Sequence, residues 1–340
     1  DTRGYTEGAA LYGDYALVAD GPQGLQIVDI ADPVRMRTVS EAYPLAYAYD
    51  VVCAGSIAYL AGGGSGVFTV DLSDPLHPAE AGLTPLDGFT YDLELLGGKL
   101  YAACAWGGVT ALNLDSPLAP KRAINAQTSG WAMALCAFGK DLLVLDGADG
   151  AMIYGVAPGA LVHLSTYTLG GFALAGAVSG TTAYVLDREK GLLLLDCKDR
   201  RTPVITGRWM PLLEGRRLTM QDGACYVAGG LCGMHVFDMA NAISPAETYW
   251  YDTGGGYANQ VLLDQGIAYL TTHLATREPL TIFDVSNPLL PKKLGALPND
   301  EKIFNSAFRA MCMGEGTLLI AGEQCDITVN IDDLTKPYAL

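Results

Sequence analysis

The sequence is poor in the residues on which most catalytic and metal sites depend. Among 340 residues it has only four histidines, and it contains no HExxH, no GxSxG and no phosphate-binding glycine loop. Its eight cysteines show neither the CxxC nor the CxH spacing of metal sites. The familiar zinc, serine-hydrolase and phosphate-loop motifs are therefore excluded, and we expect no metal site and no cofactor.

Positive charge is scarce as well. The chain has 21 basic and 37 acidic residues, a net charge of -16. The negative electrostatic potential around such a protein opposes contact with nucleic-acid phosphates and anionic membranes. No apolar run has membrane-spanning length, and no convincing amphipathic helix is present. We therefore expect no nucleic-acid partner, no direct membrane insertion and no helical solenoid.

What the sequence does have is an internal repeat. A short apolar run ends at an anchor residue, usually Asp or Asn, at intervals of about 42 residues that widen to about 46 near the end. The eight anchors are Asp29, Asp71, Asn113, Gly155, Asp196, Asp238, Asp284 and Asn330. One supersecondary unit repeated over the whole chain predicts a single domain spanning residues 1–340.

Each unit has the signals of four short strands, which we call a to d. Glycine stands five residues before the anchor in six copies, and a proline follows the anchor in every copy. Strand c is apolar at consecutive positions, as in Gly-Leu-Leu-Leu-Leu-Asp at 191–196, so it is expected to be buried on both faces. In a β-propeller each blade packs between two neighbours. The sequence therefore predicts an all-β propeller of eight four-stranded blades, with seven blades as the alternative.

The strand-c strings also carry a family resemblance. Leu25-Gln26-Ile27-Val28-Asp29-Ile30 and Thr281 to Val285, followed by Ser-Asn-Pro, resemble the LVIVD-repeat proteins of bacteria and archaea. That resemblance implies a β-propeller. It brings no catalytic motif, and the fourth and eighth copies depart furthest from the pattern.

Three structural expectations follow from the repeat. The anchor carboxylates should cap their own turns rather than form a ring of ligands. The cysteines should be free thiols, with a bridge between Cys225 and Cys232 across a hairpin as the one alternative. The chain stops soon after Pro337, so Asp1 to Tyr5 should pair with the last blade and cover its edge.

Large side chains gather where propeller topology places the b-to-c turns and d-to-a connections. Aromatic rings with a few polar groups at a concave mouth are typical of a ligand site. The candidate binding residues are Tyr49, Tyr91, Trp106, Trp131, Phe172, Arg188, Arg216, Tyr257, His273, Arg277 and Arg309. The alternative is that these aromatics are core wedges between blades. The longer connections around the seventh unit lie on the same face.

Two classes of function remain open. The first is a noncatalytic, monomeric binding or scaffolding propeller whose partner is a protein, peptide or glycan. Its arginines, gathered in blades five to eight, would attract a carboxylate or acidic sugar. The second is an enzyme acting on a carbohydrate or small polar substrate, with Asp50, Asp92, Glu7 and Glu214 as candidate acids. Carboxylates that face each other across solvent would favour the enzyme, whereas carboxylates bonded to backbone amides would favour the binding protein.

The compartment is not fixed by the sequence. The chain begins at Asp1 rather than at Met, which suggests that a leader has been trimmed. We expect a surface or secreted protein, with the cytoplasm as the alternative.

Overall fold

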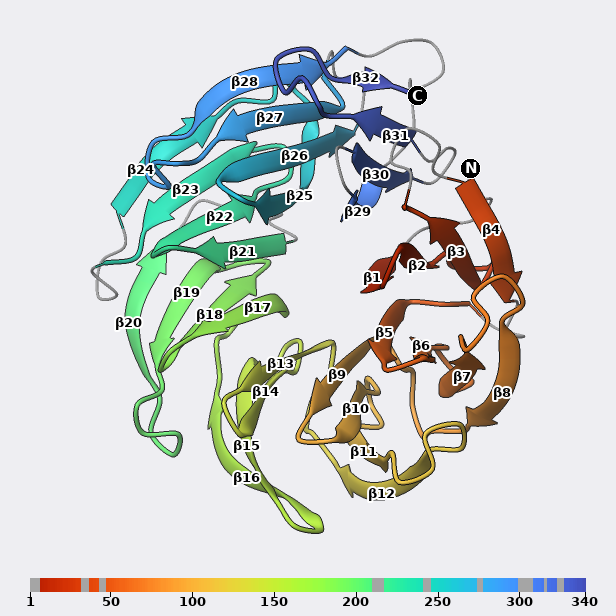
Figure 1. The fold of residues 1–340 in the computed structure, drawn as a ribbon. Coiled ribbons are helices and arrows are strands. Elements are labelled where there is room, and N and C mark those ends of the chain that lie inside the picture. Colours follow the sequence, from red (N-terminus) through yellow and green to blue (C-terminus); the bar gives the residue numbers. More distant parts are fainter. Residues whose placement is uncertain are drawn as a thin grey trace.

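The computed structural model is an all-β ring of eight four-stranded antiparallel sheets (Figure 1). It describes residues 7–31, 37–42, 47–209, 217–240, 246–273, 278–298, 308–314, 317–322 and 327–340. The eight-bladed propeller is confirmed, and the seven-bladed alternative is wrong. Within these residues no helix is long and apolar enough to cross a membrane.

Each blade is built from four consecutive strands, with strand a lining the centre of the ring and strand d at the rim (Figure 1). The first four blades are β1 (Gly8–Tyr12), β2 (Tyr15–Ala19), β3 (Leu25–Asp29), β4 (Arg37–Ala42); β5 (Asp50–Ala54), β6 (Ile57–Ala61), β7 (Val67–Asp71), β8 (Ala79–Thr84); β9 (Asp92–Leu96), β10 (Lys99–Ala103), β11 (Val109–Asn113), β12 (Lys121–Ala126); and β13 (Ala134–Phe138), β14 (Asp141–Leu145), β15 (Ala151–Ala157), β16 (Ala160–Tyr167).

The last four blades follow the same plan. They are β17 (Ala173–Ser179), β18 (Thr182–Asp187), β19 (Gly191–Asp196), β20 (Val204–Trp209); β21 (Arg217–Gln221), β22 (Ala224–Ala228), β23 (Met234–Asp238), β24 (Ala246–Tyr251); β25 (Tyr257–Asp264), β26 (Ile267–His273), β27 (Leu280–Asp284), β28 (Lys292–Leu297); and β29 (Phe308–Gly314), β30 (Thr317–Gly322), β31 (Ile327–Asn330), β32 (Tyr338–Ala339).

The core lies between blades, which explains the uninterrupted apolar strands. All five residues of β14 and of β22 are buried, whereas β12 on the rim is mostly exposed. Apolar clusters join each blade to the next, and the cluster of blade 1 reaches Leu319 of blade 8. Each blade is therefore buried on both faces, and the apolar contact between blades 1 and 8 closes the ring.

Polar bonds fix the spacing between blades. In blades 1 to 4 and 6, a residue of the b-to-c turn forms a two-residue β-bridge with the entry to strand a of the following blade, as between Gly63 and Thr90. Deeper in the sheets, the Tyr226 hydroxyl donates to the Pro288 carbonyl of the next blade at 2.7 Å. These bonds satisfy buried polar groups and set the register of neighbouring blades.

The anchor carboxylates cap their turns, as expected. Asp71 Oδ1 accepts the Ser73 amide at 2.8 Å, and the same bond links Asp196 to the Lys198 amide and Asp284 to the Ser286 amide. A carboxylate bonded to its own turn is a structural device of the repeat.

Blade 8 takes its outer strand from the C-terminal end of the chain. β32 pairs with β31 through Val329 with Ala339 and Asn330 with Tyr338. The expected pairing of Asp1 to Tyr5 with this blade falls outside the described residues.

The described cysteines are free thiols. Cys53, Cys104, Cys136, Cys197, Cys225 and Cys232 form no disulfide, so the hairpin pair Cys225 and Cys232 is not bridged. Burial raises the pKa of Cys197 to about 11 and of Cys136 to about 12. These thiols are poor nucleophiles at neutral pH.

Candidate ligand-binding face

The b-to-c turns and d-to-a connections come together at one face of the ring. In the part of the chain that the structure describes, β-bridges hold five d-to-a connections against the preceding b-to-c turn. The residue just before the bridge therefore lies over that turn in every blade where it is described. These equivalent positions hold Tyr47, Phe89, Trp131, Phe172 and Tyr257.

Two of these aromatic rings pack directly on a glycine of the preceding turn. A Cβ atom added to Gly63 would lie 2.9 Å from the ring of Phe89, and one added to Gly147 would lie 3.0 Å from the ring of Phe172. Both glycines have positive φ, so the turn also needs glycine for its backbone. Phe89 and Phe172 are therefore wedges between blades, and Tyr257 is buried with 6% exposure.

In blades 2 to 4 these rings join others to form a continuous surface, which we call the aromatic belt. It consists of Tyr47, Tyr49, Phe89, Tyr91, Trp106 and Trp131. Consecutive ring centroids lie between 4.5 and 6.3 Å apart. Such contacts stabilise the rings in fixed orientations.

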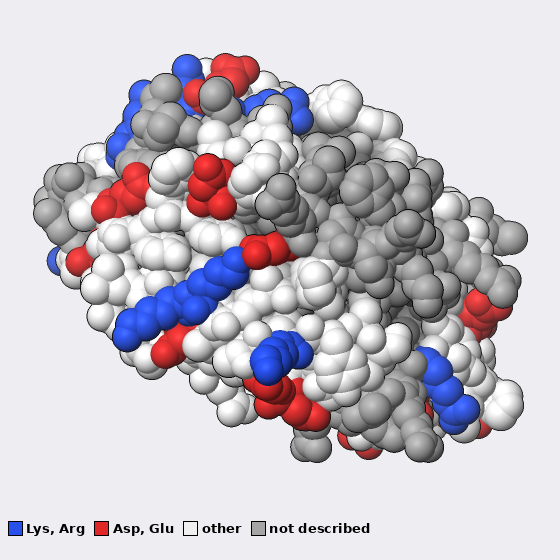
Figure 2. All heavy atoms as spheres, turned by 90° about the horizontal axis from the view of Figure 1, so that it is seen from above, with Lys and Arg blue, Asp and Glu red and all other residues white. Residues whose placement is uncertain are grey.

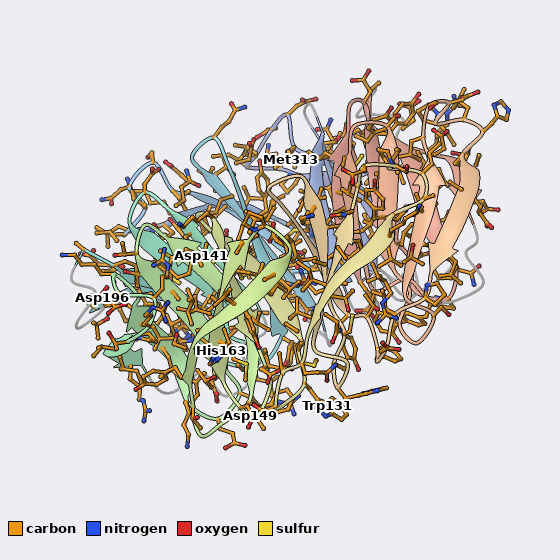
Figure 3. The ribbon with its side chains drawn as sticks, turned by 90° about the horizontal axis from the view of Figure 1, so that it is seen from below. Trp131, Asp141, Asp149, His163, Asp196 and Met313 are labelled. Carbon is orange, nitrogen blue, oxygen red and sulfur yellow. The ribbon has the colours of Figure 1, made fainter. Side chains whose placement is uncertain are left out.

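The outer end of the belt is open to solvent. Trp106 is 55% exposed and Trp131 is 49% exposed, and their rings meet edge to face at 5.9 Å. Figure 3 shows Trp131 beside Asp149 at one end of the molecule, far from Asp141 on the opposite turn face. Large rings held rigid at a solvent-exposed surface are the usual anchors of a binding site.

Sequence reasoning found only part of this belt. It named Tyr49, Tyr91, Trp106 and Trp131, which the structure brings together, but it missed Tyr47 and Phe89. The missed signal was the spacing of about 42 residues between Tyr47, Phe89 and Trp131. Tyr49 and Tyr91 belong to a different register, two residues further along the chain.

The arginine half of the predicted site is described only in part. Arg188 is exposed and lies over the Phe172 ring, with its Cζ atom 5.9 Å from the centroid. Arg216 and Arg277 lie outside the described residues, as does Glu214, and the side chains of His273 and Arg309 are likewise not described. The prediction for blades five to eight stays a prediction.

Inside the channel, one register position at the start of strand a carries the charged residues. Six of its occupants are Gly8, Asp50, Asp92, Ala134, Arg217 and Gln260, each paired with a residue at or near the end of its own strand b. Two neighbouring blades thus contribute acids, and blade 6 contributes a base. Arg217 Nη2 donates to the Glu7 carbonyl oxygen at 3.1 Å, so its side chain joins blade 6 to blade 1.

The channel carboxylates bond to backbone amides of the following blade. Asp50 Oδ2 accepts the Leu93 amide at 3.1 Å, and Asp92 Oδ2 accepts the Leu135 amide at 2.7 Å. Two residues further along β9, Glu94 Oε2 accepts the Ala137 amide at 3.3 Å. These acids connect adjacent inner strands.

Burial dominates the electrostatics of this channel. Desolvation raises the pKa of Asp50 to about 6 and the pKa of Asp92 well above its ordinary range, where the charge of Asp50 adds to the effect. Desolvation also raises the pKa of Glu94. Among the described residues, no group of three or more His, Cys, Asp or Glu side chains could hold a metal ion.

Comparison with known proteins agrees with the repeat. Residues 3–42, 46–84 and 170–210 match the model of the LVIVD repeat. The chain carries LVIVD repeats. The three matched segments are blades 1, 2 and 5, and the propeller is consistent with the family of LVIVD-repeat propellers. No curated protein matches this chain in sequence at a significant level.

Solved structures share the fold. The computationally designed Ika8 protein is 10% identical with a TM-score of 0.76, and the alignment covers 96% of each chain. Sqt1 of Chaetomium thermophilum, bound to the N-terminus of a ribosomal protein, is 11% identical with a TM-score of 0.73 over 95% of this chain and 96% of Sqt1. BamB from Moraxella catarrhalis is 12% identical with a TM-score of 0.67, over 94% and 92% of the two chains. At such identities the likeness extends to the fold alone.

Proposed function

We propose that this protein is a noncatalytic binding propeller, monomeric in solution, whose ligand is a protein, peptide or glycan that lies across the aromatic belt. The observation that carries the proposal is the unbroken series of ring contacts across blades 2 to 4, which ends in two half-exposed tryptophans. Such rings supply contact area at low cost in conformational entropy.

The belt has the organisation of a binding surface rather than of stray exposed residues. Its inner rings, Tyr49 and Tyr91, are partly buried and pack edge to face at 5.5 Å, so they support the outer ones. Trp106 and Trp131 are then held in place while they remain accessible. Rigid aromatic anchors of this kind typically contribute most of the binding energy of an interface.

The channel supports the same class of function. Hydrolysis by two carboxyl groups needs them about 5 to 10 Å apart with substrate and water between them. Asp50 and Asp92 instead accept backbone amides of the next blade, and each is thereby engaged in the wall. This arrangement favours the binding protein over a carbohydrate-acting enzyme.

A partner protein is the first class of ligand to test. The similar propeller Sqt1 is bound to the N-terminus of a ribosomal protein, which is an example of a propeller that binds a terminal segment of its partner. Extended peptides with apolar side chains fit a belt of rings, and pyranose rings stack on tryptophan in the same geometry.

The experiment compares two variants that alter the same turn in different blades. Wild type is screened on a peptide library and a glycan array, and each hit is measured again with Trp106→Ala and with Leu231→Ala. Leu231 occupies the corresponding position of the b-to-c turn in blade 6 and is 57% exposed. Trp106→Ala should weaken binding by about tenfold or more, since loss of an anchor costs about 2 kcal/mol, whereas Leu231→Ala should leave it unchanged.

Two results would contradict the proposal. If both variants bind as wild type does, the belt is not the contact surface. If a ligand is cleaved during incubation, as mass spectrometry would show, and Asp50→Asn abolishes the cleavage, the protein is an enzyme.

A further inference from the structure

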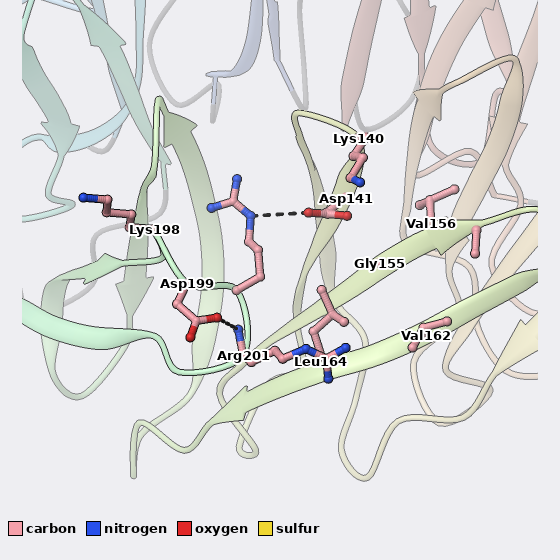
Figure 4. A pocket seen from close by; sticks show the side chains of 11 residues that line it. Lys140, Asp141, Gly155, Val156, Val162, Leu164, Lys198, Asp199 and Arg201 are labelled. Carbon is pink, nitrogen blue, oxygen red and sulfur yellow. Dashed lines mark hydrogen bonds and ion pairs between the residues drawn. The ribbon is translucent and has the colours of Figure 1, made fainter.

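A second surface lies on the opposite turn face, between blades 4 and 5. There a groove with a cavity volume of about 590 Å³ runs between the β15–β16 hairpin and the c-to-d turn of blade 5 (Figure 4). Cavities of about 300 to 1,000 Å³ are of the size that binds ligands. The groove is separate from the aromatic belt, because a-to-b and c-to-d turns line it.

The groove exists because blade 4 departs from the repeat. Its anchor is Gly155, which has no carboxylate to cap the turn as Asp71 does in blade 2. The two strands continue to pair past this point, through Val156 with Leu161 and Ala157 with Ala160. The hairpin is therefore longer than its counterparts and forms one wall of the groove.

The opposite wall is basic. Lys198, Arg200 and Arg201 follow one another in the c-to-d turn of blade 5, and Lys140 adds a fourth cation from the a-to-b turn of blade 4. Two acids, Asp141 and Asp199, also line the groove. Four cations against two acids give a local positive excess in a protein whose net charge is -16.

On another side of the molecule the charges are mixed. On the side of the molecule shown in Figure 2, basic and acidic side chains lie next to one another rather than in patches of one sign. Concentrated charge of the minority sign marks a place that attracts an oppositely charged partner.

One arginine in the groove is fixed in place. The Arg200 guanidinium lies over the Phe138 ring at 3.4 Å from its centroid, and its Nε atom is 3.4 Å from Asp141 Oδ2. Its Nη1 also donates to the Cys197 carbonyl oxygen. Arg200 is therefore held against the wall of the groove by a ring, a carboxylate and a carbonyl oxygen.

The remaining cations are free to meet a ligand. Lys140, Lys198 and Arg201 are exposed, and among the described residues no side-chain ion pair joins them to a carboxylate. Beside them the hairpin presents Val162, which is 42% exposed. The groove thus combines positive charge with an apolar wall.

We propose that this blade 4–5 groove binds an acidic peptide segment of a partner protein, with its carboxylates at Lys140, Lys198 and Arg201 and its apolar side chains against the hairpin. Among the described residues no strand pairs with the outer edge of β16, since it ends the sheet β13-β14-β15-β16. An extended peptide can use such an edge. Charge complementarity and the apolar wall together select a peptide over a free anion.

The probe is a fluorescent peptide of alternating Glu and Leu residues, compared with a Gln-Leu peptide of the same length. Binding is measured by fluorescence anisotropy in low salt and in about 0.3 M salt. We expect the acidic peptide alone to bind, and added salt to weaken it several-fold, because screening shortens the reach of exposed charges.

The variant is the triple substitution Lys140→Ala, Lys198→Ala and Arg201→Ala. It is matched by Lys121→Ala, Lys292→Ala and Lys336→Ala, which remove the same charge from exposed sites elsewhere. We expect the groove variant to lose affinity at least tenfold and the matched variant to lose about twofold, the share due to net charge alone. Circular dichroism confirms that both variants are folded.

Two further measurements test the contribution of the apolar wall and distinguish an acidic peptide from a nucleic acid as the ligand. Val162→Ser should weaken the acidic peptide several-fold without changing its salt dependence. A single-stranded oligonucleotide of equal charge should bind less well than the peptide. Equal loss in both triple variants, no binding of the acidic peptide, or equal binding of the oligonucleotide would each overturn the proposal. Trp106→Ala should not change this binding, which distinguishes it from the function proposed for the belt.

Discussion

Replacing Asp50 by asparagine should stabilise the folded protein at neutral pH and leave its stability unchanged in acid. The Asp50 carboxyl lies in the channel wall, where desolvation raises its pKa from 3.8 to about 6. Between these two pH values the unfolded chain loses the proton while the folded protein still holds it. The free energy of unfolding therefore falls as pH rises through this window, and above about pH 6 the loss is complete.

The size of the effect follows from the same two values. A pKa raised from 3.8 to about 6 corresponds to about 3 kcal/mol of free energy at neutral pH. Asparagine keeps an oxygen for the Leu93 amide, which Asp50 accepts at 3.1 Å, so the bond to the next blade survives. Removing the charge also relieves Asp92, whose pKa the Asp50 carboxylate helps to raise. We expect a gain of about 1 to 3 kcal/mol at pH 7.

Urea unfolding of wild type, Asp50→Asn and Glu80→Gln between about pH 4 and pH 8 measures this difference. Glu80 is an exposed residue of β8, so its substitution removes one negative charge without touching the channel. An Asp50→Asn variant that is less stable than wild type at every pH would contradict the prediction, because it would show that the Asp50 carboxylate stabilises the folded protein. An equal gain from Glu80→Gln would assign the effect to the net charge of -16.

Three further predictions concern the frame of the repeat. Gly66→Ala should destabilise the folded protein by more than about 1 kcal/mol, because the φ of Gly66 is +105° and the new Cβ would lie 2.3 Å from a backbone oxygen. Gly64→Ala in the same turn meets open space and should be nearly neutral. Thermal melts compare the two variants. Tyr226→Phe removes the hydrogen bond to the Pro288 carbonyl and should lower the free energy of unfolding by about 1 kcal/mol. Tyr101→Phe should be neutral or stabilising, since the buried Tyr101 hydroxyl has no partner among the described residues. Urea titrations compare the two variants, and a destabilised Tyr101→Phe would refute the reasoning. The described cysteines should react slowly with a thiol reagent until the protein is unfolded, and mass spectrometry that finds two or more disulfides would contradict this.

The fold was predictable because the same apolar pattern recurs in each repeat unit and indicates which strands are buried. Strand β19 has four consecutive leucines, all buried, before its anchor Asp196, and only an element covered on both faces can have such a run. The anchors Asp71 and Asp284 were predictable for a similar reason, since the bond of a carboxylate to its own turn is local. The expected pairing of residues 1–5 with the last blade stays a prediction, because these residues lie outside the described part of the chain.

The candidate sites were less predictable because they depend on register between blades. A two-residue shift separates Tyr49 from Tyr47. Only the pairing shows that Tyr47 lies over the turn of the preceding blade, through the bridge between Gly21 and Ala48, whereas Tyr49 packs on Gly63 in the turn of its own blade. The blade 4–5 groove was missed altogether. Gly155 was visible as a departure from the repeat, but the longer hairpin and its distance to Arg200 arise from pairing and from the packing of two blades.

Blade 4 shows that departures from the repeat can mark candidate binding surfaces. The frame of the propeller uses backbone bridges, turn-capping carboxylates and interblade apolar clusters, which leave the tips of the turns free to vary. A change at a tip costs little stability, so it can persist without a structural role. Blade 4 differs at both ends: it carries the exposed Trp131 on one face and lacks the capping carboxylate at Gly155 on the other. If both proposals hold, Trp131→Ala and Val162→Ser should each weaken one kind of binding and leave the other intact. The double variant should then lose both additively, because two distant sites on a rigid ring do not couple.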